Sequence, residues 1–282
     1  MYYILPETTE DMENKKDIWT SIKEELDLYN RLNLHEVVDH DKFYLYSIIA
    51  HSTAIEGSTL TELDTKLLLD EGITAGGKPL VYHLMNKDLK DAYDFAQEKA
   101  KNKTSITPGF LKELNEQVMK STGSVMNNAL GSFDSSKGDF RLCSVTAGPG
   151  GDSYMDFRKV PGYVDKLCEE LNKRLEQVKT VEEIYNLSFD AHLNLVTIHP
   201  WLDGNGRTSR LLMNYIQYYK GVIPTKVNSE EKAAYIKALD RSRKEETNIP
   251  FREFMAEQLL KTLQRETRNY KKSQSGGMTF MF

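Results

Sequence analysis

The chain has 282 residues, of which 39% are hydrophobic and 28% are charged, and its formal net charge is −5. This composition can fill one large buried core, and it shows no basic stripe, so nothing indicates a nucleic-acid partner. No apolar run reaches the ~20 residues of a membrane span, and two cysteines without metal-type spacing, Cys143 and Cys168, favour a cytoplasmic protein over a disulfide scaffold.

The N-terminal part predicts two helices. Residues 12–32 carry apolar side chains at three- and four-residue steps, which is the helical period. Residues 36–56 predict a second helix, and glycine is well suited to end it at Gly57. The apolar positions of these two helices are Ile18, Ile22, Leu26 and Tyr29, then Phe43, Tyr44, Ile48 and Ile55.

Helical periodicity continues along most of the remaining chain. The predicted helices are 61–71, 79–101, 107–121, 161–178, 181–198, 205–220, 229–243 and 250–271. Segment 181–198 is apolar on nearly every face, which predicts a helix buried at the centre of a bundle. Its end delivers His199, and Pro200 disfavours helical geometry in the residue before it. His199 is therefore expected at a rigid junction between a buried helix and a loop.

The stretch from Ser121 to Pro161 interrupts this pattern. It is rich in Gly, Ser and Asp, and "DFRLCSVTAG" has the composition of a short β-hairpin. The predicted fold class is thus all-α, a helical bundle with a short β-hairpin. We expect an N-terminal helical region over 1–58, a main domain over 59–271 and a flexible tail over 272–282.

The stretch "HPWLDGNGRTSR", His199 to Arg210, concentrates chemistry within twelve residues. Glycines on both sides of Asn205 allow backbone N–H groups to face a common hollow, and a helix begins directly afterwards, so its N-terminus is an anion site. Arg207 and Arg210 are three residues apart and share one helix face. Two guanidinium groups beside such a site suit a polyphosphate.

Two further groups complete this hypothesis. Asp203 lies at the loop entrance and is placed to hold Mg²⁺, which takes only one or two protein carboxylates. His199 can act as a base near the same phosphates. Taken singly, each element has a structural alternative: a helix-end histidine, an ordinary turn, or a solvated pair of arginines. The stretch matches neither an EF-hand nor a P-loop, because the residues that define those loops are missing.

The same stretch resembles the signature of the Fic-domain family, H-P-F-x-D/E-G-N-G/K-R-x-x-R. Trp201 in place of phenylalanine is the one departure, and the broader resemblance covers about residues 60–260. Proteins of this family typically transfer AMP from ATP to a Ser, Thr or Tyr hydroxyl of a target protein. The resemblance implies a Fic fold, ATP as nucleotide donor and Mg²⁺ as cofactor.

The resemblance also implies roles for individual residues. His199 would take the proton of the target hydroxyl, Asp203 would hold Mg²⁺, and the Asn205 side chain would assist the loop backbone with the phosphates. Arg207 would contact the β-phosphate side and Arg210 the γ-phosphate. The implied nucleotide-binding residues in this stretch are Asp203, Gly204, Asn205, Gly206, Arg207, Thr208, Ser209 and Arg210.

In the family a β-hairpin flap lies over the site and pairs with an extended target segment. Phe140 to Gly148 is the segment that resembles it, and an ordinary surface hairpin is the alternative. The flap residues expected near the nucleotide are Val145, Thr146, Ala147 and Gly148. Tyr235 is a further adenine contact by resemblance, with plain helix packing as its alternative.

An inhibitory pattern of the same family, S/T-x-x-x-E-G/N, matches "STAIEG", with Ser52, Glu56 and Gly57 at its defining positions. The resemblance pairs Glu56 with Arg210. A carboxylate there would occupy the donors meant for the γ-phosphate and would repel that phosphate. The alternative for Glu56 is an ordinary surface acid near a helix end.

The leading hypothesis is therefore a self-inhibited protein adenylyltransferase of the class with an N-terminal inhibitory helix. Its expected partners are ATP and a target protein with a hydroxyl side chain, with the chain itself among the targets. The helices over 12–56 could form a homodimer face or pack on the core. The alternatives are a hydrolase that removes AMP using Glu56, a transferase for another nucleotide, and a nucleotide-binding regulatory module without turnover. His192, seven residues before His199, is better explained as a packed histidine than as a metal ligand.

Overall fold

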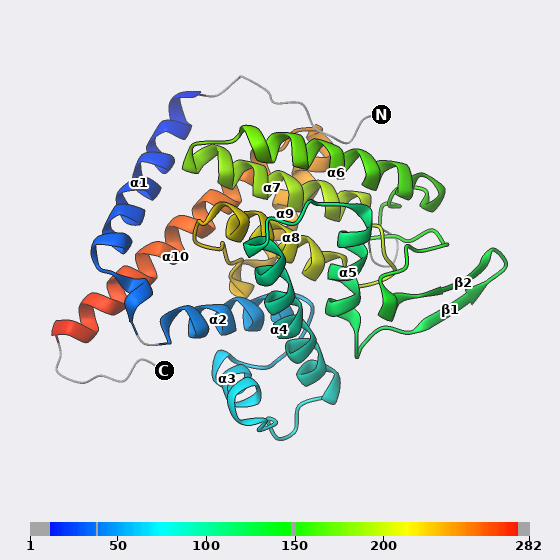
Figure 1. Cartoon of the computed structure of the whole chain (residues 1–282), viewed down its shortest axis with the longest axis horizontal. Coiled ribbons are helices and arrows are strands. Elements are labelled where there is room, and N and C mark those ends of the chain that lie inside the picture. Colours follow the sequence, from blue (N-terminus) through cyan, green and yellow to red (C-terminus); the bar gives the residue numbers. More distant parts are fainter. Residues whose placement is uncertain (1–11, 38, 148–150, 276–282) are drawn as a thin grey trace.

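The structure is a computed structural model that describes residues 12–37, 39–147 and 151–275. In this part of the chain, helices supply most of the structure and one two-stranded sheet accompanies them, as predicted (Figure 1). The helices are α1 (Met12–Arg31), α2 (His40–Ile55), α3 (Glu62–Glu71), α4 (Leu80–Lys101), α5 (Pro108–Met119), α6 (Val160–Gln177), α7 (Val181–Ile198), α8 (Asn205–Lys220), α9 (Lys232–Glu245) and α10 (Ile249–Ser275).

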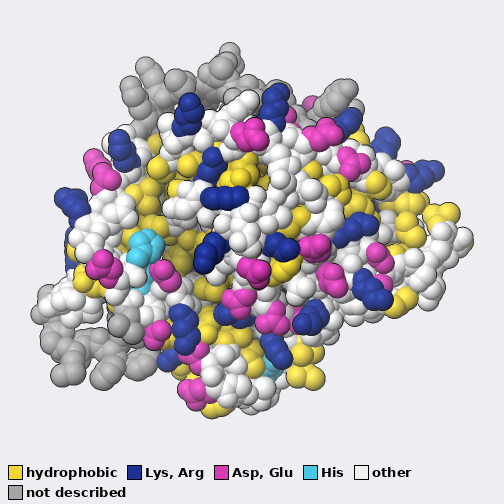
Figure 2. Space-filling view, in the orientation of Figure 1, with side chains coloured by type: hydrophobic (Ala, Val, Ile, Leu, Met, Phe, Trp, Pro, Cys, Tyr) yellow, Lys and Arg dark blue, Asp and Glu magenta, His cyan; other side chains and the backbone are white. Residues whose placement is uncertain are grey.

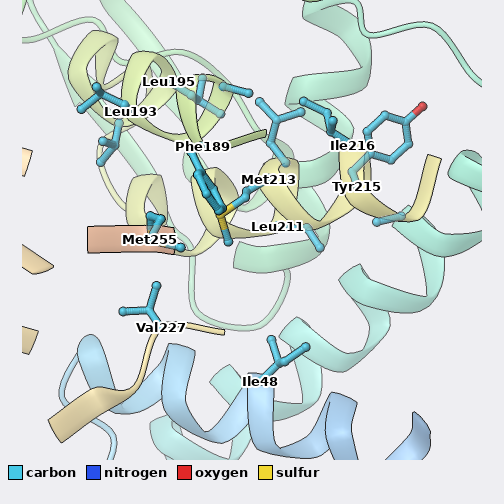
Figure 3. Close-up of a cluster of buried hydrophobic side chains, with 14 of the residues drawn as sticks. Ile48, Phe189, Leu193, Leu195, Leu211, Met213, Tyr215, Ile216, Val227 and Met255 are labelled. Atoms are coloured by element: carbon cyan, nitrogen blue, oxygen red, sulfur yellow. The ribbon is translucent and has the colours of Figure 1, made fainter. Parts of the chain in front are cut away.

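Helices α7 and α8 pack against each other at the centre of the bundle. A capping box begins α7, because the Thr180 side chain accepts from the Glu183 N–H while the Glu183 carboxylate accepts from the Thr180 N–H. Figure 3 shows part of this buried cluster, which contains side chains of both helices together with Ile48 of α2 and Met255 of α10. Each fully buried Leu or Phe of this cluster stabilises the fold by about 1.5–3 kcal/mol relative to an exposed one.

The N-terminal helices belong to the same core. Helix α1 packs along α10, and α2 packs on α3, α4 and α8 (Figure 1). Ile22 of α1 and Ile48 of α2 lie in the same hydrophobic cluster as Phe189 of α7. The expected boundary after residue 58 therefore crosses one continuous core, to which both N-terminal helices contribute apolar side chains.

The structure corrects the bounds of some predicted helices. The helix expected from residue 36 begins only at His40, because Asp39 has a left-handed conformation with φ 60°. Phe43, expected on the apolar side, is 38% exposed and lies beneath the ammonium of Lys66. Helix α10 continues to Ser275, so the expected flexible tail is helical at its start, and residues 276–282 lie outside the described residues.

The strands are not where the sequence predicted them. Strands β1 (Val125–Asn128) and β2 (Gly131–Asp134) form an antiparallel hairpin that projects from the bundle (Figure 1). They are mostly exposed and lack alternating hydrophobicity, which is why the sequence pattern missed them.

The segment that was expected to form the hairpin pairs only briefly. Thr146 bridges Ser153, the Ala147 N–H donates to the Asp152 carbonyl, and the Tyr154 N–H donates to the Val145 carbonyl. We call residues 145–147 and 152–154 the flap. Gly148, expected near the nucleotide, lies outside the described residues.

Charged side chains are mixed on the surface. On the face seen in Figure 2, acidic and basic groups are interspersed and no stripe of one sign is present. Across the described part of the chain, no helix has the length and apolar content needed to span a membrane.

Candidate functional site

His199 caps the C-terminus of α7 in a left-handed conformation, with φ 53° and ψ 61°. Its N–H still donates to the Leu195 carbonyl at 3.0 Å, and Pro200 prevents the helix from continuing. The ring Nδ1 lies 3.3 Å from the Val196 carbonyl oxygen. Because a carbonyl can only accept, Nδ1 carries the hydrogen and Nε2 keeps the lone pair. The local fold therefore selects the tautomer that a general base needs.

The surroundings of His199 keep its ring neutral. Burial lowers the pKa of His199 to about 4, and the positive charges of Arg141 and Arg243 act in the same direction. The hydrogen bond to Val196 and the charge of Asp203 oppose this shift without reversing it. A neutral imidazole at physiological pH can accept a proton from a hydroxyl.

The resemblance implies a transfer reaction, and we expect the rate of that reaction to depend on pH accordingly. Since a base works only when unprotonated, kcat/KM should be flat between about pH 6 and 8 and should fall below about pH 5. The measurement is a pH profile of the Glu56→Gly variant at saturating magnesium. An acid limb centred near the ordinary histidine pKa would contradict the buried, neutral ring.

The flap covers the His199 ring. The Tyr154 ring stacks on the imidazole with ring centres 3.7 Å apart and planes 16° from parallel. The guanidinium of Arg243, from α9, lies 5.5 Å from the centre of the Tyr154 ring. The sequence pattern did not single out Tyr154 or Arg243, because neither belongs to a local motif.

The loop after His199 is held by its own side chains. Trp201 is fully buried, and its indole N–H donates to the Gly138 carbonyl at 3.0 Å. The Asn205 side chain accepts from the Trp201 N–H at 3.1 Å and donates to the Trp201 carbonyl at 2.9 Å. Asn205 was expected to assist with phosphates, but here both ends of its amide shape the loop.

Helix α5 forms the wall behind this loop. Gly204 has φ 78°, and a Cβ at this position would lie 2.7 Å from the Met119 sulfur and 2.8 Å from Asn115 Nδ2. Asn115 donates to the Thr208 hydroxyl at 3.0 Å. Thr208 and Ser209 are both fully buried, so their side chains face the core. Asn115 and Met119 are site residues that the sequence pattern missed.

The N-terminus of α8 is an electropositive site. As at every helix start, its first N–H groups have no acceptor within the helix. No side chain caps them either. The Arg207 guanidinium is buried, with Nη2 3.2 Å from the Met119 sulfur and 3.6 Å from Asp203 Oδ2. Among the described residues, Arg207 Nε and Nη1 have no hydrogen-bond partner. Buried donors of this kind fit a bound phosphate, which would satisfy them.

Asp203 stands at the open side of this site. Its side chain is 66% exposed, and one carboxylate oxygen accepts from the Gly204 N–H at 2.6 Å. A single accessible carboxylate next to a phosphate site fits Mg²⁺, which usually keeps several waters and shares substrate phosphates. Among the described residues, no three or more His, Cys, Asp or Glu side chains come together in a group that could hold a metal ion. His192 therefore belongs to no such group.

Arg210 is held by the C-terminal end of α2, where Glu56 is the capping residue. It is buried, donates from Nε to the Ser52 hydroxyl at 2.8 Å and from Nη2 to the Ser52 carbonyl at 3.0 Å. Nη2 also lies 2.6 Å from Glu56 Oε1. That same oxygen is 2.5 Å from where a Cβ on Gly206 would lie, so a side chain at this position would displace the carboxylate. The Glu56 carboxylate therefore occupies the N-terminus of α8 itself.

The charge state of Glu56 follows from this position. Burial acts to raise its pKa, but the charge of Arg210 and the hydrogen bond from it outweigh burial, assisted by Arg207 and Lys232. The net result is a lowered pKa for Glu56, and its side chain is 32% exposed. The carboxylate is thus a stable anion at the anion site. Gly57, which follows it, has φ 102°, a conformation that favours glycine directly after a helix, and its N–H donates to the Ala54 carbonyl.

Tyr235 lies behind Arg210. It is 2% exposed, receives a hydrogen bond from Arg210 Nη1 at 3.3 Å, and its hydroxyl is 2.9 Å from His192 Nε2. Its ring packs between His192, Phe251 and Phe254. The buried ring supports a role in fixing Arg210 rather than the adenine contact that the resemblance implied. His192 is fully buried and stacks on Phe251.

Comparisons with known proteins agree with this geometry. Residues 105–217 match the model of the Fic/DOC family. A curated protein of Drosophila erecta, named Protein adenylyltransferase Fic, is 28% identical over 262 residues, which are 90% of this chain and 46% of that protein. This chain thus spans about half the length of the curated relatives it matches.

Two solved structures share the fold. One is a Fic domain containing signaling protein from Bacteroides thetaiotaomicron, with a TM-score of 0.74 and 22% identity, covering 92% of this chain and 100% of that one. The other is a part of Fic-1 from C. elegans, with a TM-score of 0.71 and 22% identity, covering 92% of this chain and 74% of that one.

Proposed function

Because this chain belongs to the Fic/DOC family, with residues 105–217 matching the family model, we propose that it is a self-inhibited protein adenylyltransferase. It transfers AMP from ATP to a Ser, Thr or Tyr hydroxyl of a target protein. One observation carries the proposal: the Glu56 carboxylate lies at the α8 N-terminus, 2.6 Å from Arg210 Nη2 and against Gly206. An anion already held there indicates what the site is built to bind.

The proposed chemistry uses the groups around this point. The target hydroxyl gives its proton to His199 Nε2 as its oxygen attacks the α-phosphorus of ATP, and pyrophosphate leaves. The free donors of Arg207 and the N–H groups of α8 stabilise the phosphate charge, so no covalent protein intermediate is needed. Mg²⁺ bound at Asp203 would neutralise charge on the same phosphates.

The proposed inhibition is direct competition for Arg210. With Glu56 in place, Arg210 has no donor free for a γ-phosphate on the side that faces α2. The Glu56 carboxylate and the γ-phosphate also repel each other. ATP that binds above the carboxylate has its α-phosphate displaced from the line of attack. A misplacement of about 1 Å is enough to lower the rate by about a hundredfold.

Intact mass measurement tests the proposal. Purified Glu56→Gly protein is incubated with Mg²⁺ and each nucleotide in turn, alone or with a target protein that exposes Ser, Thr and Tyr hydroxyls. The mass added to either protein identifies the group transferred. We expect an AMP adduct from ATP. An adduct from another nucleotide would change the donor. Tight ATP binding with no adduct on any target would favour the regulatory module.

The hydrolase alternative is tested separately. AMP-modified target is incubated with the wild-type chain, in which Glu56 could orient a water molecule. Loss of the adduct would make removal of AMP the resting activity. It stays a prediction that the target carries a hydroxyl side chain, that the chain can form a homodimer, and that the protein is cytoplasmic.

A further inference from the structure

Arg141 uses all three nitrogens of its guanidinium group near the site, although it touches none of the phosphate-binding groups. It is fully buried and precedes the first flap segment, residues 145–147, by a short stretch of chain. Its Nε donates to the carbonyl of His199 at 2.8 Å. Its Nη1 donates to the Cys143 carbonyl at 2.7 Å, and its Nη2 donates to the Met155 carbonyl. Three carbonyl groups from three segments thus converge on one guanidinium.

These three carbonyl groups belong to the two ends of the flap and to the backbone turn at His199. Cys143 lies just before the first flap segment, and Met155 follows directly after the second, next to the Tyr154 that stacks on the base. His199 is the base itself, in a left-handed conformation that a non-glycine residue adopts at a cost. The Arg141 backbone N–H adds a bond to the Pro200 carbonyl at 3.0 Å. The residue therefore joins both sides of the flap to the backbone turn that carries the imidazole.

We propose that Arg141 is a positioning residue: it fixes the His199 turn and ties the flap to it, so that a hydroxyl held by the flap meets Nε2 of the base. This role rests on the adenylyltransferase proposed above. A planar guanidinium suits it because its fixed fork of N–H groups can reach several carbonyls at once, whereas an ammonium on a flexible chain cannot hold all three.

The first test needs no activity. The pKa of the His199 imidazole is measured by NMR on histidine-labelled protein, with the signal assigned by its loss in His199→Ala. In Arg141→Met we expect this pKa to rise from about 4 toward the ordinary value, because the turn loosens, water enters and one positive charge is removed. Arg158→Met is the matched control, since Arg158 is 76% exposed and pairs with Asp156 near the flap. An unchanged His199 pKa in folded Arg141→Met would overturn the proposal.

The second test uses Arg141→Lys in the Glu56→Gly background, because lysine keeps the charge and is the variant more certain to fold. We expect kcat to fall by about tenfold or more while the ATP dissociation constant stays within about threefold, since a misplaced base costs rate and not nucleotide affinity. Full kcat in Arg141→Lys would contradict the positioning role. If the Glu56→Gly parent itself transfers nothing, the proposed function fails, and the NMR measurement still decides the role of Arg141.

Discussion

Glu56→Gly is expected to transfer AMP about a hundredfold faster than the wild-type chain, or more. The change removes the carboxylate that lies 2.6 Å from Arg210 Nη2 and frees both this donor and the space beside Gly206. Arg210 stays in place, because its bonds to Ser52 and Tyr235 do not involve Glu56. The measurement is the initial rate of transfer from labelled ATP with Mg²⁺ present.

Two controls sharpen this prediction. Glu56→Gln keeps the size of the side chain and removes its charge, so a rise smaller than that of glycine would show that volume and charge both inhibit. Without the carboxylate, the buried Arg210 charge loses its ionic partner, and a phosphate can replace it. ATP should therefore raise the Tm of Glu56→Gly more than that of the wild type. Equal rates for wild type and Glu56→Gly would reject the inhibitory role.

His199→Ala in the Glu56→Gly background is expected to lower transfer by about 10²- to 10⁴-fold, the usual contribution of a positioned general base. The imidazole is the group with a free Nε2 lone pair and a pKa low enough to stay neutral. ATP binding should persist, because Arg207 and Arg210 belong to α8 and do not contact the imidazole. Rate and ATP affinity are measured on the same preparation.

The matched control is His35→Ala, which removes an exposed imidazole that interacts with Asp41, far along the chain from the loop. It should leave the rate unchanged. If His199→Ala kept most of the transfer rate, another group would have to take the proton, and the assignment of the base would be wrong. A loss of rate together with a loss of ATP binding would point to collapse of the loop instead.

Much of this fold could be predicted from the sequence because it depends on interactions between residues that are close in the chain. The periodic apolar positions predicted helix α7 with its observed bounds, and the apolar residues on all its faces predicted its central burial. The stretch from His199 to Arg210 is contiguous, so its turn and helix start form from neighbours in the chain. The strands at 125–134 escaped notice because they bury little and therefore leave no hydrophobic pattern.

The residue pattern alone established the helical class and the buried helix that leads to His199, and it predicted an anion site at the start of α8. The family resemblance added the pairing of Glu56 with Arg210, which lie 154 residues apart. The folded structure was needed to see that Arg141 holds the His199 carbonyl across 58 residues and that Tyr154 covers the imidazole. Such contacts join segments that are distant in the chain, and residue spacing carries no information about which distant carbonyl or ring a side chain meets once the helices pack.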